Sequence, residues 1–140
     1  MIARLALLVL TVLATFSLCA CDSQTGPYVE MNGGGFVVNY SAGFSEAFYG
    51  FGVKPLRELP AGLVLEASFE NPAGGPPLID RQEVTGPLLK YGFRTPYLKG
   101  IVANRPYLAT LRVMKPGTRE VIETYTKSFQ SKFDDAWLAK

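Results

Sequence analysis

Apolar and polar residues alternate along several short segments of this chain, most clearly over residues 63–71. One side of this segment is apolar, with Leu63, Leu65, Ala67 and Phe69, and the other is mostly polar, with Glu66, Ser68 and Glu70. A period of two residues is typical of a β-strand with one buried face. The Pro- and Gly-rich residues 71–77 follow and predict a loop that ends the strand.

The same period predicts further strands downstream. Residues 107–114 place their apolar side chains on one side, namely Tyr107, Ala109, Leu111 and Val113. The Lys-Pro-Gly-Thr sequence at 115–118 then predicts a turn, and 120–129 is rich in Val and Thr, so these two strands are expected to form a hairpin. Three other segments are also expected to be strands: 49–53, 78–85 and 91–95.

The region 28–48 begins with two β-prone runs on either side of Asn32-Gly33-Gly34-Gly35. Asn-Gly between such runs favours a hairpin, and a flexible linker is the alternative. A phosphate-binding loop is disfavoured, because no Lys-Ser/Thr pair follows the glycines and no helix begins there. We therefore expect an N-terminal hairpin or extension over residues 28–48.

Aromatic residues are concentrated at the end of this region and just beyond it, at Phe44, Phe48, Tyr49 and Phe51. A spacing of four between the first two suits a helical turn, whereas residues 49–53 alternate as a strand does. Two interpretations stay open. The rings fill the core, or they form a contact surface for a sugar or a protein, together with Tyr91 and Tyr97.

The C-terminal residues 131–140 differ from the rest. Ser131-Lys132-Phe133-Asp134 resembles a helix capping box, in which Ser131 caps the helix and a carboxylate lies three residues on. A short helix would place Phe133, Trp137 and Leu138 on one face. The only tryptophan, Trp137, is then expected either to fasten this helix to the body or to serve as an exposed docking residue.

Six to eight short strands separated by turn signals predict an all-β fold, an antiparallel immunoglobulin-like β-sandwich with a short C-terminal helix. From residue 51 onwards the order of segments resembles an immunoglobulin-like or fibronectin-type-III-like module. In that resemblance 63–71 corresponds to the second strand and 107–114 to the penultimate one. It also implies that Tyr107, which follows the turn at 104–106, occupies the position of a tyrosine corner. The chain has no inter-sheet cysteine pair and no tryptophan in the third strand.

The N-terminus has the pattern of a secretory signal. Arg4 precedes a run from residue 5 to 20 in which only Thr11, Thr15 and Ser17 are polar. The run ends in Leu18-Cys19-Ala20-Cys21, which resembles the lipobox of bacterial lipoproteins. The resemblance implies that signal peptidase recognises Leu18 and Ala20, that residues 1–20 are removed, and that Cys21 carries the lipid. An uncleaved membrane helix over residues 5–21 and plain secretion are the alternatives.

This resemblance divides the chain into a signal peptide (1–20), a lipidated tether (21–27) and one domain (28–140). Acyl chains such as palmitate on Cys21 would hold the domain firmly on a membrane, since each buried CH₂ contributes about 0.8 kcal/mol. Asp22 directly after the lipidated cysteine resembles an inner-membrane retention signal. We therefore expect a lipid-anchored protein of the bacterial cell envelope that faces the periplasm, at the inner rather than the outer membrane.

Composition narrows the function further. After loss of Arg4, 13 of the 14 basic residues remain against 12 acidic ones, which argues against nucleic-acid binding. Cys19 leaves with the signal and Cys21 is lipidated, so the mature fold is expected to have no disulfide and no free thiol.

Candidate catalytic residues are scarce. The chain has no histidine, the commonest general base and metal ligand. Glu66 and Glu70 would lie about 13 Å apart on one strand face, too far for a glycosidase pair. We therefore expect no enzyme activity, no cofactor and no metal. The predicted function is a membrane-anchored, protein-binding or assembly module with an envelope protein as partner. The alternative is a small-ligand or glycan-binding module that uses the aromatic residues.

Overall fold

The structure, a computed structural model, describes residues 26–41 and 43–140. The predicted signal peptide with Leu18 and Ala20, the lipidation site Cys21 and the sorting residue Asp22 lie outside the described residues. Among those that are described, no helix is long and apolar enough to cross a membrane.

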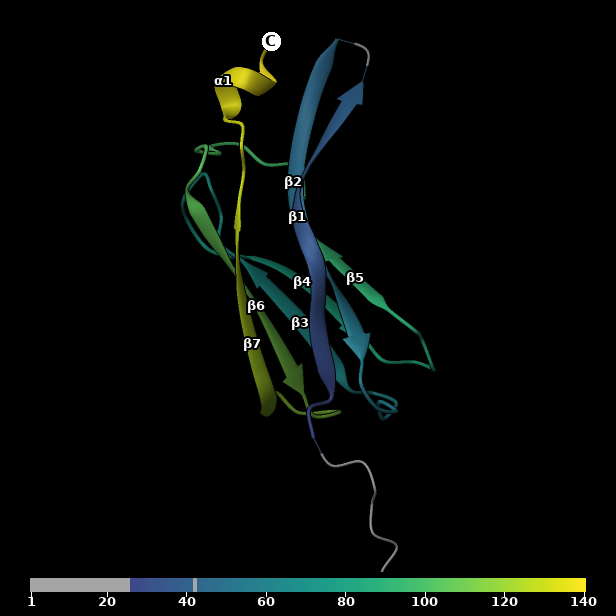
Figure 1. The fold of residues 1–140 in the computed structure, drawn as a ribbon. Helices are drawn as coiled ribbons and strands as arrows, with labels where there is room; N and C mark the ends of the chain where they lie inside the picture. Colours follow the sequence, from purple (N-terminus) through teal and green to yellow (C-terminus); the bar gives the residue numbers. More distant parts are fainter. Residues whose placement is uncertain (1–25, 42) are drawn as a thin grey trace, which may run out of the picture.

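Seven strands are found in the described part of the chain, and they form two antiparallel sheets (Figure 1). The three-stranded sheet has the order β1 (Val29–Ser41), β2 (Phe44–Pro55) and β5 (Tyr91–Arg94). The four-stranded sheet has the order β4 (Leu78–Glu83), β3 (Val64–Phe69), β6 (Pro106–Met114) and β7 (Val121–Gln130). The helix α1 (Asp135–Leu138) follows. This confirms the predicted all-β antiparallel sandwich with a short C-terminal helix, in the three-plus-four arrangement of an immunoglobulin-like fold.

Strand β3 lies within the predicted segment 63–71 and is oriented as its pattern predicts. Leu65, Ala67 and Phe69 are fully buried between the sheets. In chain order it is the third strand rather than the second, because β1 and β2 both precede it. Tyr107 lies in β6, the penultimate strand, and its hydroxyl accepts a hydrogen bond from the Val102 backbone N–H at 2.9 Å. That bond to the preceding loop is the contact expected of a tyrosine corner.

The predicted hairpin turn at residues 32–35 is wrong, and so is the flexible-linker alternative. Strand β1 runs through these residues and pairs with β2 on both sides of them, Asn32 with Gly52 and Gly35 with Gly50. The extra residues form a β-bulge, which the three glycines accommodate with positive φ angles of 62°, 105° and 149°. A Cβ on Gly34 would lie 2.5 Å from the Gly50 carbonyl oxygen, so the bulge packs directly against β2. The chain reverses direction further on, between Ser41 and Phe44, which pair with each other.

Side chains close both lateral openings of the sandwich. On one side the Asp80 carboxylate of β4 accepts a hydrogen bond from the Arg94 backbone N–H of β5 at 3.2 Å. On the other side the Glu123 carboxylate of β7 accepts from the Tyr28 N–H at 3.1 Å, and Lys127 Nζ donates to the Gly33 carbonyl at 3.0 Å. These contacts join the two sheets along both of their sides.

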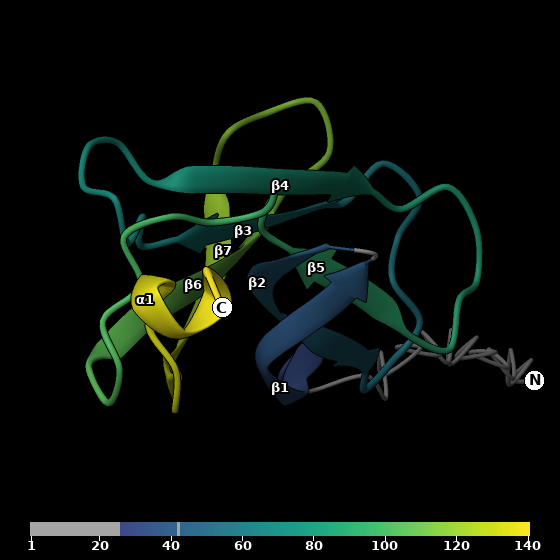
Figure 2. The ribbon, with the colours of Figure 1, turned by 90° about the horizontal axis from the view of Figure 1, so that it is seen from above.

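Antiparallel strands place their connections alternately at two ends of the sandwich (Figures 1 and 2). We call the end where β1 begins the proximal end; it also holds the loops 56–63, 84–90 and 115–120. The distal end holds the β1–β2 turn, the loops 70–77 and 95–105, and residues 131–140 with α1. Strand β1 has 13 residues and joins the two ends over about 40 Å.

Candidate functional site

The predicted contact aromatics separate into buried and exposed groups. Tyr49 and Phe51 are 0% and 4% exposed and belong to the core. Of the two interpretations left open, core filling therefore holds for these two rings and surface contact does not. Residues 44–55 form the strand β2 without a helical turn, and the side chains of Tyr49 and Phe51 point between the sheets. Tyr91 is buried in the same core. Phe44 and Tyr97, by contrast, expose 56% and 45% of their surface.

A column of rings rises from the core to the distal end. Tyr49 stacks on Phe36 with centroids 4.7 Å apart, and Phe36 meets Phe133 edge to face at 6.3 Å. Phe133 stacks on Trp137 at 5.5 Å, and Trp137 meets Tyr40 at 6.1 Å. Trp137 is still 43% exposed and Tyr40 69%. Trp137 therefore packs on the body through Phe133, as one of the two predictions has it, and 43% of its surface still faces solvent.

The helix α1 is fastened by a carboxylate that accepts two backbone hydrogen bonds. Asp135 accepts from the N–H groups of Gly100 at 2.6 Å and Ile101 at 3.1 Å. The helix begins three residues later than a Ser131 cap would place it, because Asp134 is the cap and accepts from the Trp137 N–H at 2.8 Å. Ser131 is instead buried and bonded to the backbone of Phe133, so its predicted capping role is wrong.

A groove of about 380 Å³ lies between the β1–β2 turn, the 95–105 loop and α1. It is lined by Phe44, Ser45, Glu46, Tyr97, Leu98, Lys99, Asp135, Leu138 and Ala139. Two of the predicted contact residues, Phe44 and Tyr97, form part of its wall, and Trp137 is adjacent in α1. Four exposed rings lie at this end of the molecule, and Leu138 beside them is half-buried. We call these five residues the distal aromatic surface: Tyr40, Phe44, Tyr97, Trp137 and Leu138.

The side chain of Tyr97 is held by one hydrogen bond and by a contact with a neighbouring ring. Its hydroxyl accepts a hydrogen bond from Asn39 Nδ2 at 2.9 Å, and its ring lies 6.2 Å from that of Phe48. The Arg94 guanidinium stacks on Phe48 at 3.8 Å from the ring centroid. Phe48 is half-buried, so this predicted contact residue supports Tyr97 and Arg94 more than it faces solvent.

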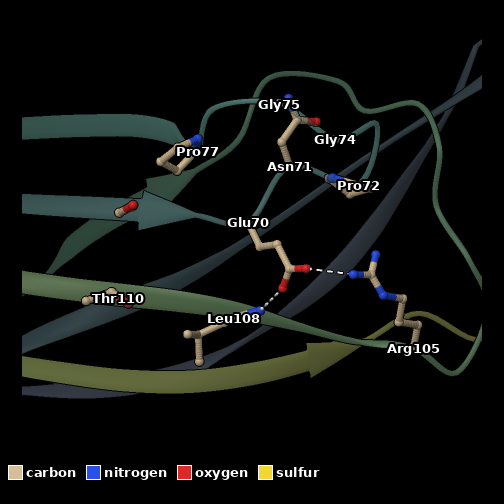
Figure 3. A pocket seen from close by; sticks show the side chains of 10 residues that line it. Glu70, Asn71, Pro72, Gly74, Gly75, Pro77, Arg105, Leu108 and Thr110 are labelled. Atoms are coloured by element: carbon tan, nitrogen blue, oxygen red, sulfur yellow. Dashed lines mark hydrogen bonds and ion pairs between the residues drawn. The ribbon is translucent and has the colours of Figure 1, made fainter.

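A second hollow of about 450 Å³ lies at the distal end of the four-stranded sheet (Figure 3). Its charged groups are Glu70 and Arg105, which form an ion pair at 2.8 Å. The other Glu70 oxygen accepts from the Leu108 N–H at 3.0 Å, as Figure 3 shows. Both oxygens of the Glu70 carboxylate therefore already accept hydrogen bonds within the protein and are less available to a ligand. We regard the distal aromatic surface as the stronger candidate site.

The Glu66 carboxylate lies between two arginines on the outer face of the same sheet. Arg81 Nε donates to one oxygen at 3.0 Å, and Arg112 Nη1 lies 3.4 Å from the other. The hydrogen bonds from Arg81, foremost, hold the pKa of Glu66 below its usual range. Glu66 and Glu70 are thus held by separate cations. In the part of the chain that the structure describes, no group of three or more His, Cys, Asp and Glu residues could hold a metal ion.

The comparisons with known proteins were negative. No protein-family model matches this chain, and no curated protein matches it.

Sequence reasoning missed Tyr40 and Asp135 as members of this site. A signal for Tyr40 existed, since Phe36, Val38 and Tyr40 share one face of a strand with a period of two. Asp135 carried no such signal, because its two partners lie about 35 residues earlier in the chain.

Proposed function

We propose that this chain is a lipoprotein of the bacterial cell envelope that binds a protein partner through its distal aromatic surface. In this proposal Cys21 carries the lipid, the domain faces the periplasm, and the protein acts as a non-enzymatic binding or assembly module without a cofactor. One observation carries it: the exposed rings gather at the end of the sandwich opposite the end where the chain enters the fold.

An anchor at the proximal end would leave the distal aromatic surface accessible to other proteins of the envelope. A lipid at Cys21 keeps the proximal end close to the membrane, and the sandwich then holds the distal aromatic surface about 40 Å further away. Confinement to one membrane raises the effective concentration of the domain for partners in the same envelope. Tyr and Trp side chains that are held in place are the residues that most often dominate the energy of protein interfaces.

A small ligand is the second candidate, because the groove beside Phe44 and Tyr97 has about 380 Å³ of space, within the range of ligand pockets. Two of the four rings first predicted for such a site are buried, however, and the groove is formed by only two exposed rings. A protein partner uses the exposed faces of Tyr40 and Trp137 as well, and we favour it for that reason.

The test places a photo-crosslinking amino acid at Tyr97 in the full chain, in living bacteria. A matched control carries it at Val121, which is 44% exposed at the proximal end of β7. We expect one discrete crosslinked protein from Tyr97 and none from Val121, and loss of that product when Phe44→Ser is added. Equal crosslinking from both positions, or none from Tyr97, would refute the distal binding site.

The anchor is tested separately. The mature protein should sediment with membranes and show a lipidated Cys21 by mass spectrometry, whereas Cys21→Ala should leave it unprocessed or soluble. An intact, unmodified N-terminus in the wild-type protein would overturn lipidation and leave the distal surface to be judged by the crosslinking alone.

A further inference from the structure

Three leucines are exposed at the proximal end of the sandwich. Leu89 is 94% exposed, Leu88 58% and Leu56 45%. Leu88 and Leu89 lie in the loop 84–90, next to Gly86-Pro87, and Lys90 follows them. Single exposed apolar residues are common on protein surfaces, but two adjacent leucines at a loop tip, one of them nearly free of contacts, have no role in this fold.

These leucines lie beside the residues where the chain enters the fold. The Leu56 N–H donates to the Tyr28 carbonyl at 2.9 Å, and the Arg57 guanidinium stacks on the Tyr28 ring at 3.4 Å. Arg57 and Leu88 in turn line the same hollow of about 280 Å³. In Figure 1 the 84–90 loop lies at the same end of the molecule as the start of β1.

The length of chain between Cys21 and Tyr28 limits how far the proximal end can lie from the membrane. Seven peptide units separate Cys21 from Tyr28, and a fully extended chain of that length spans about 25 Å at most. A lipid on Cys21 would therefore keep the proximal end within that distance of the bilayer surface. The distal end, one β1 length further on, would be out of reach of the lipid.

We propose that the Leu88–Leu89 loop inserts into the surface of the membrane that holds the lipid, and that it orients the domain with its distal end away from the bilayer. The inference rests on the lipidation of Cys21 in the proposed function. Leucine side chains at an interface gain from leaving water for the acyl boundary, and Lys90 can keep its ammonium group among the lipid headgroups. A bilayer is the fitting occupant because the loop is apolar at its tip and lies within reach of the anchor.

A fluorescent probe at one position tests this inference in the mature lipoprotein, reconstituted in protein-free vesicles of phosphatidylethanolamine and phosphatidylglycerol. Once Cys21 is lipidated and Cys19 removed, Leu89→Cys supplies the only free thiol, which takes an environment-sensitive dye. The matched control is Val102→Cys, 53% exposed at the distal end. Both positions are solvent-exposed, so neither substitution is expected to disturb the core.

We expect a blue-shifted, brighter emission from the dye at position 89, with quenching by nitroxide-labelled lipids, and a water-like spectrum from position 102. Adding Leu88→Ser should reduce the shift at position 89. A water-like spectrum at 89 in protein that remains bound to the vesicles would overturn the insertion, and so would equal shifts at 89 and 102. Protein that fails to stay on the vesicles and lacks lipid by mass spectrometry would instead refute the anchor, and with it the premise of this inference.

Discussion

The two ends of this sandwich both expose apolar side chains, but they support them differently. At the distal end Trp137 and Tyr40 continue a column of rings that reaches the core through Phe133 and Phe36. At the proximal end Leu89 extends from a loop and is 94% exposed. Rings held by the core form a surface of fixed shape. Such a surface binds a folded partner at a lower entropic cost, because its side chains lose less conformational freedom on association.

Binding to a bilayer does not require a surface of fixed shape. Its acyl boundary is fluid and adapts to a side chain of any orientation, so an unsupported leucine loop is sufficient to bind it. We therefore expect a structured protein to bind at the distal end and a lipid surface to bind at the proximal end. Three substitutions test whether the two ends differ in this way.

The largest effect is expected from Phe36→Ala, which removes the ring that joins Tyr49 to Phe133. Phe36 is half-buried, so we expect a loss of about 2–3 kcal/mol in the free energy of unfolding, measured by urea denaturation. The near-ultraviolet circular dichroism of Trp137 should weaken as well, because its supporting stack is lost. Val37→Ala on the other face of β1 is the control, with a change within about 0.5 kcal/mol. Equal losses for both variants would show that the ring column is not supported by the core.

A smaller, local effect is expected from Asp135→Asn. Replacing the carboxylate weakens its hydrogen bonds to Gly100 and Ile101 by about 1 kcal/mol, and exchange of those two amide protons with solvent should become several-fold faster. Glu123→Gln is the matched change at the proximal end, where it should speed exchange of the Tyr28 amide instead. If each substitution altered exchange at both ends, the two ends could not be treated as independent.

The smallest effect is expected in the body between the ends, from Glu66→Gln. Because the pKa of Glu66 is lowered in the folded protein, its charge stabilises the fold above the ordinary glutamate pKa of about 4.3. This stabilisation is lost as the pH falls through the lower, folded-state value. Since Arg81 and Arg112 are largely exposed, we expect a difference of about 1 kcal/mol or less at pH 7. In urea titrations the difference should begin to shrink as the pH falls below about 4.3 and continue to shrink at lower pH. A difference that stayed constant down to pH 3 would contradict the assigned ion pairs.

Much of the fold could be predicted where burial alternates along the strand. Strands β3 and β6 have one buried face throughout, so a period of two in the sequence described both of them closely. Tyr107 could be assigned to a corner because a turn and a strand start met at one residue. Each of these features depends on neighbours within a few positions.

The candidate site was predictable only in part. Phe44, Tyr97 and Trp137 were predicted as contact residues and lie together at the distal end. Residue type alone, however, could not distinguish the buried Tyr49 and Phe51 from the exposed Phe44. Their burial depends on the opposing sheet, in particular on Phe69 and Phe129, whose rings lie 5.2–6.3 Å from theirs. No pattern within residues 44–51 encodes those contacts.

Side-chain alternation is a local property of an extended chain, so the amino-acid sequence was sufficient to predict strands such as β3 and β6. It was not sufficient to show that Asn32–Gly35 is a bulge within one strand and not a turn. The reason is that Gly34 fits against the Gly50 carbonyl, the Cβ of Phe51 and the ring of Phe129, which come from two other strands. The same long-range packing decided which aromatic rings are buried and which face solvent at the distal end.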